Sequence, residues 1–125
     1  MRRPIAALLM LSMAAPALAA APGTAQNFLD RASRLKSKGP LALFDGDIGK
    51  LKAEAIAAGQ SIAADRRAAE KAGRPKQYCS PQPKAELGQN EFLSGLEAIP
   101  ARERARISLK QAMLQILQKK YPCPR

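Results

Sequence analysis

Apolar residues recur at intervals of three and four in four stretches of this chain, which is the spacing of one face of an α-helix. The first predicted helix begins at Asn27, which can cap it, and ends at Gly39-Pro40, because proline cannot continue a helix. Residues 41–44 then form a short apolar run, long enough for one helical turn. The inner face of the first helix is predicted to consist of Phe28, Leu29, Ala32 and Leu35.

The second predicted helix opens at residues 45–47 and is long, ending at Gly73 with Pro75 just beyond it. Its small residues would allow another helix to approach closely. The predicted inner face comprises Ile48, Leu51, Ala55, Ile56, Gly59, Ile62 and Ala63.

Three prolines predict a loop over residues 74–88. A third helix is expected to start at Gln89 or Asn90 and to end near Pro100, and a fourth to run from about Arg102 to Lys120. The buried face of the fourth helix is predicted as Ala105, Leu109, Ala112, Met113, Ile116 and Leu117. The pattern therefore predicts an all-α fold, a small bundle of about four helices in a single domain over residues 27–125.

The amino-acid composition agrees with this fold class and excludes several classes of function. The 125 residues include no valine, and Thr24 is the only threonine, although β-branched residues pack best in sheets. The absence of histidine removes His-based triads and imidazole metal ligands, and the lack of tryptophan argues against a base-stacking surface. Asp45-Gly46-Asp47 lacks the spaced oxygen ligands of a calcium loop and is interpreted as a helix start. We expect no enzyme activity, no cofactor and no metal site.

The first residues have the three parts of a secretory signal. Arg2 and Arg3 are followed by an uncharged apolar run over residues 5–18, and Ala17-Leu18-Ala19 is an A-x-A cleavage pattern. We expect residues 1–19 to be a signal peptide cleaved near Ala19 and residues 20–26 to be a flexible lead-in. The predicted location is periplasmic or secreted. An uncleaved membrane anchor is the alternative interpretation of the same segment.

Cys79 and Cys123 are the only cysteines, and the predicted signal would deliver them to an oxidising compartment. Such a pair predicts a disulfide, worth about 3–4 kcal/mol in the chain-entropy model. The alternatives are a redox pair, which favours Cys-x-x-Cys spacing, and a zinc site, which needs more ligands.

The second half of the chain resembles a known family. Cys79-Ser80-Pro81 is followed by a helix ending at Ile99-Pro100, an Ala-containing helix and the tail Tyr121-Pro122-Cys123-Pro124. This order resembles the Tai-type immunity family, periplasmic proteins that neutralise peptidoglycan amidases delivered by type VI secretion. The resemblance covers residues 79–124 and implies a protein-binding role, with a secreted amidase effector as partner.

The formal charge is +11, and a cluster of cations suggests a contact surface. Arg102, Arg104 and Arg106 lie at the expected start of the fourth helix, where cations oppose the helix dipole. We predict that they form a partner-binding region with Lys76 and Lys84 of the loop. The alternative is that these cations only keep the protein soluble. The charge could also attract anionic membrane or cell-wall surfaces, whereas export makes nucleic acid a poor partner.

Two classes of function therefore remain open. The first is a protein-binding module of the immunity type, which would block an enzyme by covering its cleft. The second is a periplasmic stress or acid chaperone. Without Arg2 and Arg3 of the signal, the chain has 10 acidic residues against 19 basic ones, which would produce strong self-repulsion on acidification.

Overall fold

The computed structural model describes residues 20–81 and 85–124, which form six helices. Four of these have ten residues or more, and within the described ranges there is no strand, only one isolated bridge between Thr24 and Ser108. The elements are α1 (Ala25–Ser37), the 3-10 helix η1 (Gly39–Phe44), α2 (Asp47–Lys71), α3 (Gln89–Ala98), α4 (Ala101–Arg104) and α5 (Leu109–Lys120). The predicted all-α fold is confirmed.

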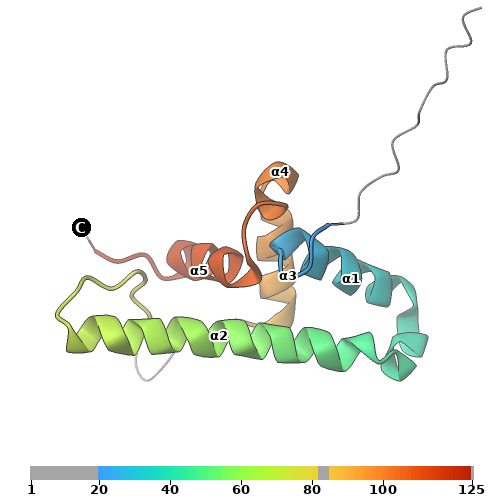
Figure 1. The fold of residues 1–125 in the computed structure, drawn as a ribbon, viewed down its shortest axis with the longest axis horizontal. Coiled ribbons are helices and arrows are strands. Elements are labelled where there is room, and N and C mark those ends of the chain that lie inside the picture. Colours follow the sequence, from blue (N-terminus) through green and yellow to red (C-terminus); the bar gives the residue numbers. More distant parts are fainter. Residues whose placement is uncertain (1–19, 82–84, 125) are drawn as a thin grey trace, which may run out of the picture.

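The long helix α2 forms one edge of the molecule, and α1 and α5 lie along the same side of it (Figure 1). Helix α3 contacts both α1 and α5, and α4 stands beyond the end of α3, on the side away from α2 (Figure 1). The predicted signal peptide, residues 1–19, lies outside the described residues. Of the helices that are described, none combines the length and hydropathy that a membrane crossing requires.

One hydrophobic core joins all the longer helices. Leu96 of α3 is fully buried at its centre, and the rings of Phe28 and Phe92 pack tilted with their centroids 5.6 Å apart. Helix α5 contributes its expected apolar stripe. The buried residues of this stripe are Leu109, Ala112, Met113 and Leu117, with Ile116 half-buried beside them.

Helix α2 presents a narrower apolar face than the pattern predicted. Leu51, Ala58 and Ile62 are buried, and they follow the helical period. Ile56 was expected to be buried, and this is wrong because 59% of it is exposed. Gly59 faces α5, but a β-carbon there would lie 3.9 Å from the sulfur of Met113, an ordinary contact, so this position does not require glycine.

The first helix begins earlier than expected. Thr24, not Asn27, is its N-cap, and the Thr24 hydroxyl accepts a hydrogen bond of 3.2 Å from the Asn27 backbone N–H. Ala25 and Gln26, assigned from the sequence to the lead-in, therefore belong to α1. The expected helix ends at glycine are confirmed: Gly39 and Gly73 both have positive φ angles, of 58° and 66°.

The single helix expected from Arg102 to Lys120 is wrong, because the chain breaks between α4 and α5. Ser108 accepts a 3.1 Å hydrogen bond from the Gln111 N–H, and the Gln111 side chain accepts one of 2.8 Å from the Ser108 N–H. Backbone bonds to the segment before α1 reinforce the break, with Ala25 N–H donating to Ile107 and Leu109 N–H to Gly23. Ala105, predicted to be buried, is consequently exposed.

Candidate binding surface

Arg104 is the best-connected of the three arginines predicted to bind a partner. Its Nε donates a 2.8 Å hydrogen bond to Gln26 of α1. Its Nη1 donates to the carbonyl oxygens of Leu96, Glu97 and Ile99, at the C-terminal end of α3. The last carbonyls of a helix lack their usual donors four residues on, and besides Arg104 the Leu96 oxygen here accepts a cap bond from the Ile99 N–H. A cation placed there supplies further donors and opposes the negative end of the helix dipole. Arg104 therefore fastens α4 to α3 and α1.

Arg102 and Arg106 have the opposite environment. Both are exposed, and in the part of the chain that the structure describes neither side chain makes a hydrogen bond or an ion pair. Arg102 lies in α4, and Arg106 lies two residues beyond its end, in the turn before α5. Helix α4 itself stands on the side of the molecule away from α2 (Figure 1). We call Arg102 and Arg106, together with α4, the α4 surface.

The predicted loop cations do not join this surface. Lys76 lies near the C-terminal end of α5, where its carbonyl oxygen is 3.6 Å from Cys123 Sγ and its ammonium is 3.5 Å from Glu70. Arg106 instead lies just before the N-terminal end of α5. A 12-residue helix is about 18 Å long. The expected combined patch is therefore split between the two ends of α5, while Lys84 lies outside the described residues.

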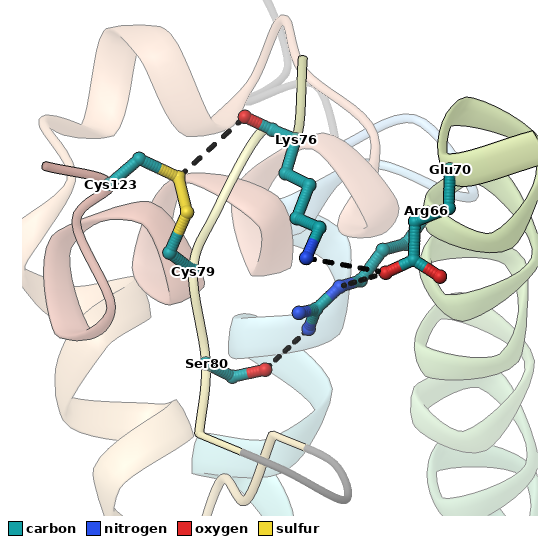
Figure 2. The surroundings of a disulfide bond; sticks show 6 residues. All are labelled: Arg66, Glu70, Lys76, Cys79, Ser80 and Cys123. Carbon is teal, nitrogen blue, oxygen red and sulfur yellow. Dashed lines mark hydrogen bonds and ion pairs between the residues drawn. A yellow bond between two sulfur atoms is a disulfide. The ribbon is translucent and has the colours of Figure 1, made fainter. Parts of the chain in front are cut away.

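The disulfide Cys79–Cys123 is confirmed and ties the loop after α2 to the tail after α5. Figure 2 shows its surroundings. The Cys79 N–H also donates a 2.8 Å hydrogen bond to the Tyr121 carbonyl. Arg66 extends from α2 and donates to the Ser80 hydroxyl (Figure 2). Its guanidinium also stacks over the Tyr78 ring, 4.9 Å from the ring centroid. The loop is thus held to both α2 and α5.

A second exposed feature was not singled out from the sequence. The turn η1 carries three large apolar side chains in solvent: Leu41 is 70% exposed, Leu43 75% and Phe44 88%. We call these three residues the η1 tip. The available signal was an apolar run enclosed between Gly39-Pro40 and Asp45, of which only Ala42 packs against the core.

Ion pairs join the residues that precede the η1 tip in the sequence to those that follow it. Arg31 of α1 contacts Asp47 at 2.6 Å and Glu54 at 2.7 Å, and Asp45 accepts from both Arg34 and Lys38. Hydrogen bonding to Lys38, to the Asp47 backbone and to Arg34 holds the pKa of Asp45 well below its usual range. Hydrogen bonding to Arg31 likewise lowers the pKa of Asp47. These carboxylates therefore remain charged at neutral pH and fix the corner between α1 and α2.

At the opposite corner, Lys120 of α5 donates 2.7 Å hydrogen bonds to Glu91 of α3 and to the Glu86 carbonyl. The bond to Lys120 lowers the pKa of Glu91 and raises that of the ammonium. Over the described ranges, no group of three His, Cys, Asp or Glu side chains could hold a metal ion.

Comparison with known proteins adds no relative: no protein-family model, curated protein or solved structure matches this chain.

Proposed function

We propose that this chain is a non-catalytic, exported protein-binding module and that the α4 surface contacts its partner. The observation that carries the proposal is that three arginines close together in the sequence have different environments. The hydrogen bonds of Arg104 hold α4 against α3 and α1. Arg102 and Arg106 are therefore exposed on a segment whose position is already fixed. A surface that is already ordered loses less conformational entropy on binding.

The chemistry of the α4 surface indicates an acidic partner. Arginine is enriched in the parts of interfaces that contribute most to affinity, and complementary charge raises the rate of association. The net positive charge acts in the same direction: it is +11 for the whole chain and falls by two, to +9, when Arg2 and Arg3 are removed with residues 1–19.

The resemblance of residues 79–124 to the Tai-type immunity family supports a more specific proposal, that the partner is a secreted peptidoglycan amidase. The disulfide between Cys79 and Cys123 is consistent with that resemblance. A gene for an amidase-like effector beside this one would add independent support.

A capture experiment tests the α4 surface. The processed protein is immobilised, bound proteins from periplasmic extract are identified, and the affinity of the captured partner is measured. R102E/R106E should weaken this affinity by about tenfold or more. The matched control is R67E/K71E, which reverses two exposed cations at the same four-residue spacing on α2, far from α4. Equal affinities for R102E/R106E and the parent would contradict the assignment, as would turnover of a wall or peptide substrate by the purified protein.

The second candidate function, an acid chaperone, is favoured by one observation. Asp45, Asp47 and Glu91 have lowered pKa values, and each bridges separate helical elements through cations. Their protonation in strong acid would release both corners and expose apolar surface. The double variant D45N/D47N should then suppress aggregation of an acid-denatured client protein at a higher pH than the parent does. An unchanged pH profile would exclude this mechanism.

A further inference from the structure

The η1 tip is an exposed apolar projection on an otherwise charged molecule. Leu41, Leu43 and Phe44 lie within four residues, and each exposes 70% or more of its surface. They occupy the turn between α1 and α2, at the end of the molecule opposite the C-terminus (Figure 1). Large apolar side chains gathered at one exposed place mark an interaction site more often than scattered ones do.

This exposure is a fixed feature of the fold. The residues on both sides of the turn are tied together, since Asp45 accepts from Lys38 and Arg34, and Asp47 accepts from Arg31. The backbone also closes, because the Asp45 N–H donates a 3.0 Å hydrogen bond to the Ala42 carbonyl. The three side chains are therefore held outward without first having to be ordered.

The charges around the turn indicate what covers it. Lys36 lies in the last turn of α1, while Lys50 and Lys52 lie in the first turns of α2, so all three are close to the η1 tip along the chain. All three are exposed, and among the described residues they form no ion pair. The nearby carboxylates of Asp45 and Asp47 are already neutralised by Arg31, Arg34 and Lys38. The flanks of the tip therefore carry uncompensated positive charge.

We propose that the η1 tip inserts into the surface of an anionic phospholipid bilayer, with Lys36, Lys50 and Lys52 contacting the headgroups. A projecting apolar turn with a cationic border combines the two terms that attach proteins to such membranes, burial of apolar area and attraction to anionic lipid. Each lysine near the surface contributes about fivefold in affinity. The inference is independent of the α4 surface, which lies on a different part of the molecule (Figure 1).

The absence of tryptophan from the chain allows a direct test. F44W places the only tryptophan at the η1 tip, and Q118W places one on the exposed side of α5 as the matched control. On titration with vesicles of phosphatidylglycerol and phosphatidylcholine, the F44W emission should shift to the blue and be quenched by brominated lipid. The Q118W emission should do neither. Because the signal comes from the tip itself, attachment through residues 1–19 would not imitate it.

Two further variants test the apolar residues of the η1 tip and the flanking lysines separately. In the F44W background, L41S/L43S should reduce partitioning by tenfold or more, on the order expected from two exposed leucines losing their burial. K36Q/K50Q/K52Q should reduce binding to anionic vesicles by about a hundredfold. K71Q/K119Q, which removes exposed lysines elsewhere, should have a much smaller effect.

The proposal is overturned if F44W shows no blue shift with anionic vesicles, or if L41S/L43S leaves partitioning unchanged. It is also overturned if F44W shifts only with protein concentration and a dimer seen by sedimentation is abolished by L41S/L43S, since the tip would then pair with a second copy. If L41S/L43S loses membrane binding but still captures the protein partner normally, the role of the η1 tip is distinct from that of the α4 surface.

Discussion

Gly95 of α3 lies directly against Ile116 of α5. A β-carbon built at Gly95 would stand 2.8 Å from both Cδ1 and Cγ1 of Ile116, closer than real β-carbons approach other atoms. The two helices therefore pack at a distance that only glycine permits at this position.

Gly95→Ala should consequently destabilise the protein. Alanine is the better helix former by about 1 kcal/mol, but overpacking typically costs about 1–3 kcal/mol, so we expect a net loss of about 1 kcal/mol in the free energy of unfolding. Urea denaturation measures the change. Gly49→Ala on α2 is the control, because nothing lies within 4 Å of its β-carbon position, and it should stabilise by up to about 1 kcal/mol. In the I116A background, Gly95→Ala should no longer lower the free energy of unfolding. A loss of stability that persists in that background would contradict the steric explanation.

Cys123→Ser should lower the free energy of unfolding by about 3–4 kcal/mol. The disulfide joins residues separated by 44 positions, and closing a loop of this length restricts the unfolded chain considerably. Thermal denaturation followed by circular dichroism, with and without reductant, measures the loss. The parent should become as unstable as the variant when reduced, and a reduced parent that remains fully stable would show that helix packing alone holds the tail.

Arg104→Ala should destabilise by about 1–3 kcal/mol, because three carbonyl oxygens and the Gln26 amide oxygen would lose a charged donor. Arg102→Ala is the matched control and should change stability by less than about 0.5 kcal/mol, since its side chain is exposed. Chemical denaturation of both variants compares them directly. If Arg104→Ala were as stable as Arg102→Ala, the role of Arg104 as a fastener of α4 would be wrong. A triple substitution of Arg102, Arg104 and Arg106 would confuse binding with stability, so the two exposed arginines must be tested separately.

Stability should fall as the solution is made acidic, beginning near the ordinary carboxylate pKa of about 4. Asp45 and Asp47 have lowered pKa values in the folded state, so their ion pairs stabilise the fold above the unfolded-state pKa. That contribution is lost as the pH falls toward the folded-state pKa. The midpoint of urea denaturation, measured from pH 7 to pH 2, should therefore decline less steeply for D45N/D47N than for the parent. Asp30→Asn, whose carboxylate accepts from Gln26 rather than from a cation, should keep the parent's profile. Parallel profiles for D45N/D47N and the parent would show that these ion pairs do not determine acid stability.

The sequence by itself determined the features that depend on near neighbours. The helical period of the apolar residues, the stops at Gly39 and Gly73 and the helix-promoting composition all act within a few positions along the chain. The two cysteines, although distant, left a single possible pairing within the chain. The fold class and the disulfide were therefore predicted correctly.

Only the tertiary structure decided the features that depend on distant partners. At the break before α5, the backbone of residues 23–25 pairs with that of residues 107–109, and this pairing joins segments far apart in the sequence. The capping box of Ser108 and Gln111 was a local signal for the same break, but it did not outweigh the apolar period that continues across it. Arg104 resembled its neighbours Arg102 and Arg106 in sequence, and only the position of the end of α3 turned it into a structural residue. The length of α5 separated Lys76 from the arginines. Of the apolar run 41–44, Ala42 packs against the core, whereas Leu41, Leu43 and Phe44 are left in solvent on a turn that the ion pairs of Asp45 and Asp47 fix. Local propensity acts over about four residues, whereas these outcomes are set by how helices pack against one another.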